Sequence, residues 1–290
     1  MTNDVHLTLA HAPLARRALL RAAPLLLTAP ALLATPARAA APAGFKTVRH
    51  GRLTLAFRPD DKPVSFIAGG KPQGFQIDFT AAIAARLGLM PEFVATDFAS
   101  MIPAVVGGRY DSAAFAVLVT PARERIVAFT TPVTFNEARL VSRRKAPLAR
   151  VQEGTGKTVA ITRGSALIPI MQRLAPGVQV REFPNIASSL NALRAGQVAG
   201  LFTGLATADA LAKAHPDLTT SQRVTSGAGA YPVAKADAAL LHAMDGAIAA
   251  LMHDGTYLRL FARWLPPRVR IPQALYDAYP GMPRQKPLAG

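Results

Sequence analysis

The sequence of 290 residues contains no cysteine, so no disulfide can stabilise the chain in an oxidising compartment. Acidic residues are scarce, with 17 aspartates and glutamates against 33 lysines and arginines, and the formal net charge is +16. Because no disulfide is possible, the stability of the folded chain must come from the size of its buried core. A chain of this length is long enough to bury the cores of two small domains.

Long apolar runs are also missing, except near the amino terminus. Arg16 and Arg17 precede an apolar stretch at 22–35, and a small-x-small pattern ends at Ala39. The stretch is short for a membrane span. We therefore interpret residues 1–39 as a signal peptide cleaved near Ala39, exported by the twin-arginine or the general secretory route. The alternatives are an uncleaved anchor or an amphipathic helix. The mature protein is expected to be soluble in the periplasm.

The excess of positive charge raises the question of nucleic-acid binding. Lysines and arginines are scattered, however, and form only short clusters such as RRK at 143–145. No basic strand with interleaved aromatics and no arginine stripe is present, so no nucleic-acid partner is expected. The charge favours attraction of anionic solutes or of an acidic membrane surface. A generally basic proteome would explain it equally well.

One segment, at 107–129, carries a specific local signal. A glycine pair at 107–108 is followed by a predicted strand at 112–119, and Thr120 and Pro121 have the preferences of a helix N-cap and first helical position. Arg123 then lies in the first turn. A guanidinium after such a strand would stand at the edge where open α/β sheets bind ligands, and could clamp a carboxylate. The alternative is a surface arginine at a helix start.

Predicted strands and helices alternate along the rest of the chain, which predicts parallel sheets with crossover helices. The predicted strands are at 53–57, 91–96, 158–161, 178–183 and 197–202. Asn185 is the predicted cap of a helix at 186–195. The last residues, 266–290, are rich in proline with few periodic apolar positions, and predict an irregular tail.

Five motifs, in sequence order, resemble those of the family-3 bacterial solute-binding proteins, the periplasmic components of polar amino-acid ABC importers. The longest combines G-x-x-D, a short strand, T-x-x-R and F-[ST]-x-P. In order, the five motifs are GFQID at 74–78, IPA at 102–104, this longest motif at 108–132, GS at 164–165, and DGT at 254–256 with Trp264. The similarity spans about residues 49–266, so the combination is specific although each motif alone is weak.

The resemblance implies an α/β, two-lobed periplasmic-binding-protein-like fold, with two parallel-type sheets flanked by helices and two hinge crossings. The expected boundaries are 45–139 with 234–266 for lobe 1, 140–233 for lobe 2, and 267–290 for the irregular tail. It also implies a monomer that binds a small carboxylate-bearing solute and docks on an inner-membrane ABC permease. No cofactor and no metal are expected.

In the resembled family an arginine at the Arg123 position clamps the ligand carboxylate, helped by the preceding strand and cap. The resemblance therefore implies a ligand-binding role for Arg123, Thr120, Leu118 and Ala116. Leu118 departs from the family, which usually has serine or threonine there. Loss of the two charged hydrogen bonds of Arg123, each worth roughly 1.5–3 kcal/mol, would lower affinity by orders of magnitude.

On the second lobe, Gly164 and Ser165 match a loop whose N–H groups face the ligand, whereas Ala166 replaces a frequent threonine. The aspartate expected to take the ligand ammonium falls on Gly204, and a small alignment slip would offer Thr203 or Thr207. An ammonium buried without a carboxylate costs several kcal/mol. Either another acid replaces this aspartate, or the ligand has no ammonium. We favour a small organic acid or an unusual carboxylated solute.

The loop after the first strand supplies the other candidates. In the family it carries an aromatic lid, which is missing here. Asp61 is an acid within reach of the cleft, although aspartates there are most often solvated turn residues. Arg58 could add positive charge, and Phe57 and Phe98 could supply apolar walls or simply belong to the core.

Three functions remain open after this reasoning. Transport, in which ligand closes the lobes for docking on a permease, is the expected one. A sensory or accessory binding protein without its own permease is the second. The third is an enzyme like the cyclohexadienyl dehydratases of this fold, which needs a positioned acid or base. We expect no enzyme, because the second-lobe loops show neither carboxylate nor histidine, and the six histidines do not cluster.

Overall fold

Two sheets organise the computed structural model, which describes residues 44–286. These residues belong to one compact unit of the chain, Arg38–Gly290. The predicted signal peptide lies outside them. Among the residues described, no helix has the length and apolar character needed to cross a membrane.

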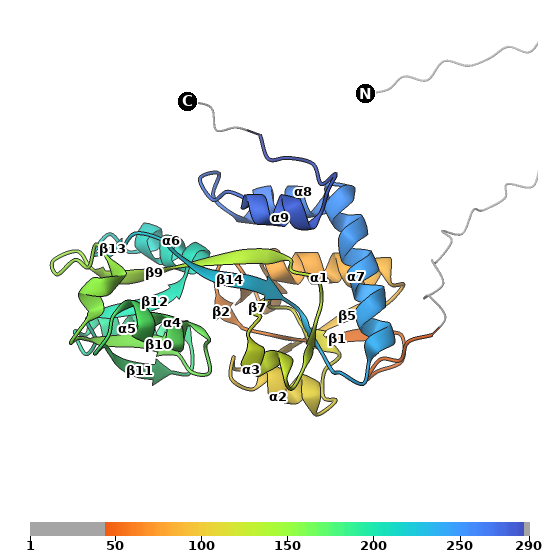
Figure 1. Cartoon of the computed structure of the whole chain (residues 1–290), viewed down its shortest axis with the longest axis horizontal. Helices are drawn as coiled ribbons and strands as arrows, with labels where there is room; N and C mark the ends of the chain where they lie inside the picture. The colour runs from red at the N-terminus through yellow and green to blue at the C-terminus, as the bar shows by residue number, and fades with distance from the viewer. Residues whose placement is uncertain (1–43, 287–290) are drawn as a thin grey trace, which may run out of the picture. The chain divides into compact units, whose positions relative to one another are not determined.

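The first lobe is built on a short parallel sheet with the strand order β5-β1-β6. Its central strand β1 is buried at every position except its first residue, because helices and loops cover both faces. Figure 1 shows α1 and α7 beside this sheet. A small antiparallel sheet, β2-β3-β4, precedes α1, and a two-stranded ribbon pairs β8 with β15. The strands are β1 (Arg52–Phe57), β2 (Asp60–Asp61), β3 (Ser65–Ala68), β4 (Lys71–Gln73), β5 (Met90–Ala95), β6 (Ser112–Ala113), β8 (Ala128–Phe129) and β15 (Pro232–Val233).

The second lobe is built on a larger sheet with the order β11-β10-β12-β9-β14-β7. Its first three strands are parallel, whereas β9 and β14 pair antiparallel and form the two long strands that connect the lobes in Figure 1. The predicted fold class agrees with this architecture, and the antiparallel strands are an addition to it. The strands are β7 (Val117–Leu118), β9 (Thr134–Arg143), β10 (Thr158–Thr162), β11 (Gln179–Phe183), β12 (Gly200–Gly204), β13 (Leu218–Thr220) and β14 (Val224–Ala230).

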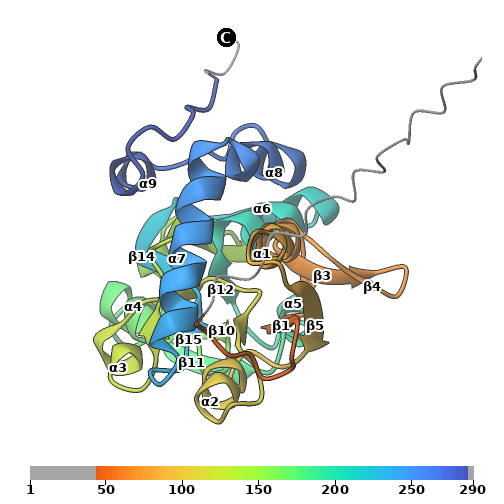
Figure 2. The ribbon, with the colours of Figure 1, turned by 90° about the vertical axis from the view of Figure 1, so that its right-hand side faces the viewer.

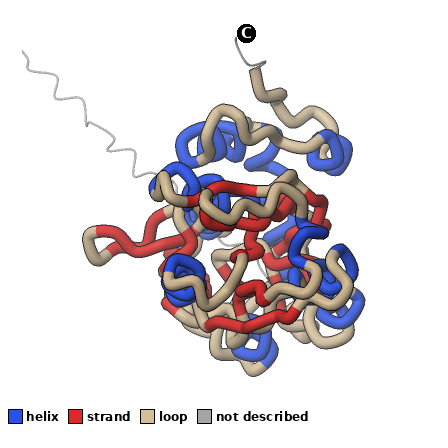
Figure 3. Tube along the Cα trace, turned by 90° about the vertical axis from the view of Figure 1, so that its left-hand side faces the viewer, coloured by secondary structure: helices blue, strands red, loops and turns tan. Residues whose placement is uncertain are grey.

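Helices cover both sheets, and the views from either side in Figures 2 and 3 show them around the strands. The largest buried cluster joins β1 to α1, α7 and α8, and includes Phe75, Phe79 and Tyr257. Two other clusters fill the second lobe. The helices are α1 (Phe75–Arg86), α2 (Met101–Val106), α3 (Pro121–Glu124), η1 (Val151–Gly154), α4 (Leu167–Leu174), α5 (Ile186–Arg194), α6 (Leu205–Ala214), α7 (Ala238–His253), α8 (Thr256–Trp264) and α9 (Gln273–Ala278).

Local signals placed two helix starts correctly. The Thr120 hydroxyl accepts a hydrogen bond from the Arg123 amide at 3.3 Å, with Pro121 at the first helical position. The Asn185 side chain accepts from the Ser188 amide at 2.8 Å and caps α5. Both caps satisfy amides that the helix itself leaves unpaired.

The carboxyl-terminal segment differs from the irregular tail that was expected. It contains α9, and its side chains complete the core of the first lobe. The Tyr279 hydroxyl donates to the Pro132 carbonyl at 2.9 Å. The buried apolar side chains of the segment are Val269, Ile271, Leu275, Tyr279 and Met282. The prolines misled the prediction because they bound a short helix instead of excluding one.

The start of α1 depends on a glycine that no other residue replaces easily. Gly74 has φ +126°, and a Cβ there would lie 2.4 Å from the Val64 carbonyl oxygen. This contact exists because the Phe75 and Gln76 amides donate to the Pro63 and Val64 carbonyls at 3.1 and 3.0 Å. The close approach fixes the position from which Gln76 reaches the cavity described below.

We expect Gly74→Ala to destabilise the protein by about 2 kcal/mol or more, because strained backbone and a backbone clash add together. Gly70→Ala is the matched control. Gly70 also has positive φ, at +71°, but open space surrounds its Cβ position. Urea unfolding of both variants measures the difference. Equal losses in the free energy of unfolding would show that the close approach to Val64 does not make Gly74 more sensitive to substitution than Gly70.

Candidate functional site

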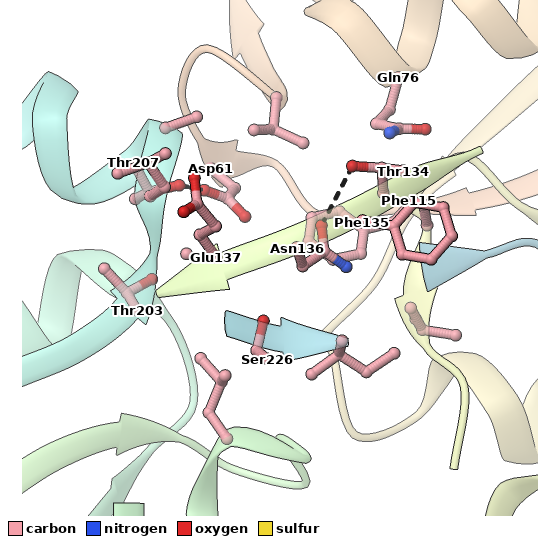
Figure 4. A pocket seen from close by; sticks show the side chains of 18 of the residues that line it. Asp61, Gln76, Phe115, Thr134, Phe135, Asn136, Glu137, Thr203, Thr207 and Ser226 are labelled. Carbon is pink, nitrogen blue, oxygen red and sulfur yellow. Dashed lines mark hydrogen bonds between the residues drawn. The ribbon is translucent and has the colours of Figure 1, made fainter. Parts of the chain in front are cut away.

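A cavity of about 190 Å³ lies where side chains of the two lobes meet. Strand β9 runs along it, β2 and α1 contribute from the first lobe, and the starts of α4 and α6 contribute from the second. Figure 4 shows that Asp61, Glu137, Thr203 and Thr207 gather at one end of this view and Gln76, Phe115 and Phe135 at the other. The cavity thus has an acidic and hydroxylated part and a part lined by aromatic rings and a side-chain amide.

Arg123 reaches the cavity from the first turn of α3. Its Nη1 donates to the Leu118 carbonyl at 2.7 Å and its Nη2 to the Gly164 carbonyl at 3.1 Å, so it contacts both lobes. The guanidinium carbon lies 5.7 Å from the centre of the Phe98 ring. Burial lowers the pKa of Arg123, and no charged neighbour in the described part opposes that effect. The side chain stays protonated, because a guanidinium is the most basic of the protein side chains. A partly buried cation without an acidic partner is suited to an anionic group.

A second arginine, Arg58, also lies over Phe98, and in addition over the neighbouring Phe115. Its guanidinium carbon is 5.5 Å from the centres of both the Phe98 and Phe115 rings. Unlike Arg123 it is neutralised within the protein, since Nη1 lies 3.3 Å from Asp61 and Nη2 lies 3.6 Å from Asp60. Its Nη2 is nevertheless buried without a hydrogen-bond partner. One donor of Arg58 therefore remains available to a ligand.

Asp61 is buried, so its interpretation as a solvated turn residue is wrong. It accepts a hydrogen bond from the Thr207 hydroxyl of α6. Burial raises the pKa of Asp61 above its ordinary value, and the opposing effects of Arg58 and Thr207 are smaller. Its neighbour Asp60 accepts from the Ile186 amide at 2.6 Å, at the start of α5. Both aspartates thus connect the first lobe to the second.

The second-lobe loop lies at the cavity, but its amides are already engaged. The Gly164 amide donates to Glu182 at 3.3 Å, and the Ser165 amide donates to the Thr162 carbonyl at 3.1 Å. The Ser165 hydroxyl accepts from the Leu167 amide at 3.2 Å and so supports the start of α4. The N–H groups that were expected to face an anion are therefore used within the protein.

Most of the predicted residues come together around the cavity. Those that line it are Arg58, Asp61, Phe98, Ala116, Leu118, Arg123, Ser165, Ala166, Thr203 and Gly204. Three others do not line it. Phe57 is in the core, edge-on to Phe93 at 6.3 Å, Thr120 caps α3, and Gly164 contributes the carbonyl that holds Arg123.

Glu137 is the main residue that sequence reasoning missed. It lies on β9, lines the cavity, and its Oε2 is 3.4 Å from Nη1 of Arg223. Its side chain keeps 30% exposure, and Arg223 keeps 49%, so this ion pair is weak and leaves Glu137 accessible. A lone acid in the strand that crosses between the lobes was the available signal. Neighbouring polar groups that were also missed are Gln76, Thr134, Asn136 and Ser226.

No group of acids and histidines in residues 44–286 is arranged to hold a metal ion. The two-lobed architecture with a charged cavity between the lobes is that of a solute-binding protein. The sequence matches the family described as bacterial extracellular solute-binding proteins, family 3, over residues 53–267. The chain belongs to this family, which confirms the resemblance noted from its motifs.

Individual relatives share this architecture and carry more specific names. The chain is 27% identical to "ABC transporter arginine-binding protein 1" of Escherichia coli (strain K12), over 67% of this chain and 82% of that protein. It is 25% identical to "L-cystine-binding protein TcyJ" of the same organism, over 76% and 84%. These relatives are binding components and not enzymes.

Solved structures agree with the fold. An ancestral arginine-binding protein bound to glutamine superposes with a TM-score of 0.71 and 28% identity, covering 74% of this chain and 98% of that one. An ancestral amino acid-binding protein described as a precursor of cyclohexadienyl dehydratase gives a TM-score of 0.69 and 25% identity, over 74% and 96%. The two-lobed fold class is therefore confirmed.

Proposed function

We propose that this protein is the periplasmic solute-binding component of an ABC importer and that it binds an amino-acid-like solute in the cavity between its lobes. The observation that carries the proposal is Arg123. Its guanidinium is held at the cavity by two carbonyls, is partly buried, and has no acidic partner in the described chain. A ligand carboxylate is the group that best satisfies such a cation.

The rest of the cavity fits the other parts of an amino-acid-like ligand. Phe98 and Phe115 meet edge to face at 5.6 Å and offer an apolar wall beside Arg123. Glu137, with the nearby hydroxyl of Thr203, offers an acceptor for an ammonium or hydroxyl group. The absence of an aspartate at Gly204 left two alternatives, and Glu137 supports the one in which another acid replaces it. We preferred a ligand without an ammonium because no acid was available to pair with it, and Glu137 removes that reason.

The names of the relatives support the same class of ligand, since they include arginine-binding and cystine-binding proteins. Contacts across the cavity suit a mechanism of lobe closure. Asp60 to Ile186, Asp61 to Thr207, and Arg123 to Gly164 each join the two lobes. Closure that ligand favours would then create the surface on which a permease docks.

We infer lobe boundaries near the long strands β9 and β14, close to 139–140 and 233–234. Strand β9 pairs with the second-lobe strand β12 near its end and lines the cavity near its start. The periplasmic location and the monomeric state belong to the same proposal.

An enzymatic role was discounted because the second-lobe loops lack carboxylates. The cavity does contain two carboxylates, Asp61 and Glu137, on β2 and β9. Asp61 is engaged by Arg58 and Thr207, and Glu137 faces Arg223. Asp61 would have to leave Arg58 and Thr207 before it could act as a general acid or base, and the named relatives are binding proteins, so binding remains the better-supported function.

Isothermal titration tests the ligand class. We expect an L-amino acid from a panel with L-arginine, L-glutamine and L-cystine to bind, and Glu137→Gln to weaken it about tenfold through loss of one charged contact. Glu124→Gln, an exposed change on α3, is the control and should leave affinity unchanged. Binding of succinate or citrate with no binding of any amino acid would instead support the ligand without an ammonium.

A further inference from the structure

A second pocket, of about 510 Å³, lies beside the ligand cavity and is separated from it by walls that include Leu205 and Val269. It is formed by β9, α6 and β13 of the second lobe and by the carboxyl-terminal segment. Its charge is strongly unbalanced, with a single carboxylate, Asp209. Its cationic side chains are Arg139, Arg144, Lys213, Arg223 and Arg268.

The single carboxylate is shared by two of these cations. Asp209 is buried, and its Oδ1 accepts from Nη1 of Arg139 at 2.8 Å while its Oδ2 lies 3.6 Å from Nε of Arg268. Nη1 of Arg139 also donates to the Thr220 hydroxyl at 3.0 Å. Nε of Arg139 is buried with no hydrogen-bond partner. The pair therefore leaves a donor and positive charge uncompensated.

The remaining cations have weak partners or none. Arg144 donates to the Pro216 and Leu218 carbonyls at 2.9 and 3.0 Å, which hold it in place but do not neutralise it. Arg223 has only the distant, exposed contact with Glu137. The side chain of Lys213 makes no hydrogen bond or ion pair to any described residue. Like charges would not be gathered around one concave surface unless something else reduced their repulsion.

We propose that this pocket binds a small polyvalent oxyanion of the phosphate class. Arginine forks bind tetrahedral and planar oxyanions through paired hydrogen bonds, and a concave basic surface concentrates anions. The pocket is distinct from the ligand cavity, since Arg123 and Arg58 line only the latter. Arg268 lies just beyond the end of the family match at 267, whereas the other four cations lie within it. A bound anion would tie the carboxyl-terminal segment to the second lobe.

Titration with inorganic pyrophosphate at constant ionic strength tests the site. We expect saturable binding by the purified protein. In the double variant Lys213→Gln/Arg268→Gln the dissociation constant for pyrophosphate should be at least about tenfold higher. The matched control is Lys157→Gln/Arg173→Gln, which removes the same charge from exposed positions outside the pocket and should bind as the parent does. Arg123→Ala should also bind pyrophosphate normally, which separates this site from the proposed ligand cavity.

Three results would overturn the proposal. The first is absence of saturable pyrophosphate binding. The second is an equal loss in the two double variants, which would indicate net charge alone. The third is binding that requires Arg123, which would place the anion in the ligand cavity. A parallel assay with phosphatidylglycerol vesicles distinguishes the source of the phosphate group. Vesicle binding that depends on Lys213 and Arg268, without pyrophosphate binding, would identify a membrane surface and exclude a free oxyanion.

Discussion

Replacing Arg123 by alanine should weaken ligand binding by roughly 3 kcal/mol, or about a hundredfold, and abolish the ligand-induced rise in melting temperature. The reason is that Arg123 is a cavity cation between the lobes without an acidic partner in the described chain, whereas Arg58 is paired with Asp61 and Arg270 is held by carbonyls of the carboxyl-terminal segment. Arg123→Lys should recover only part of the loss, because an ammonium cannot make the two parallel bonds of a guanidinium. Titration with the tightest ligand of the amino-acid panel measures both variants.

Arg125→Ala provides the control for that experiment. Arg125 is exposed two residues further along the chain, and its side chain makes no hydrogen bond or ion pair to a described residue, although its carbonyl accepts from Lys235 at 3.0 Å. It removes the same charge and should leave affinity unchanged. Undiminished binding by Arg123→Ala would refute the carboxylate clamp while leaving the family membership intact. Comparable losses in both variants would point to long-range electrostatics.

Removal of residues 268–290 should unfold the protein or bring it close to unfolding. The segment buries Val269, Ile271, Leu275, Tyr279 and Met282 in the core of the first lobe. At about 1.5–3 kcal/mol for each buried side chain, the loss is about 7 kcal/mol or more, which is comparable with the whole stability of an ordinary domain. Thermal and urea unfolding of the truncated protein measure this loss.

Point variants keep the second prediction informative if the truncated protein cannot be purified. Leu275→Ala should cost about 2–5 kcal/mol, because Leu275 is completely buried. Ala274→Ser, at the preceding exposed position of α9, should cost well under that amount. A truncated protein with parental stability would show that the segment packs on the lobe without supporting it.

The segment also bears on the binding site, because Val269, Arg270 and Pro272 line the ligand cavity. The family match ends at 267, so this wall is an addition to the matched region. Arg270 donates to the Lys286 carbonyl at 2.8 Å, and Tyr276 accepts from the Gln285 amide at 3.0 Å. These bonds hold the end of the described chain against α9. The addition thus contributes both to stability and to the shape of the cavity.

Features encoded over a few residues were predicted well. The strand β10 begins at Thr158 as expected, and β11 ends at Phe183 as expected. The caps Thr120 and Asn185 form the bonds that their side chains favour. The start of α1 has no such local signal, because its first amides donate to the Pro63 and Val64 carbonyls and no side chain caps the helix.

The sequence by itself determined the family, the alternation of strands and helices, and the placement of Arg123 at a capped helix start, because each depends on residues close together in the chain. Only the tertiary structure decided which charges are free. Asp61 is neutralised by Arg58 and joined to Thr207, and Glu137 enters the cavity from the crossing strand. Whether a charge is paired depends on side chains brought together from distant segments, and burial then sets the energetic consequence.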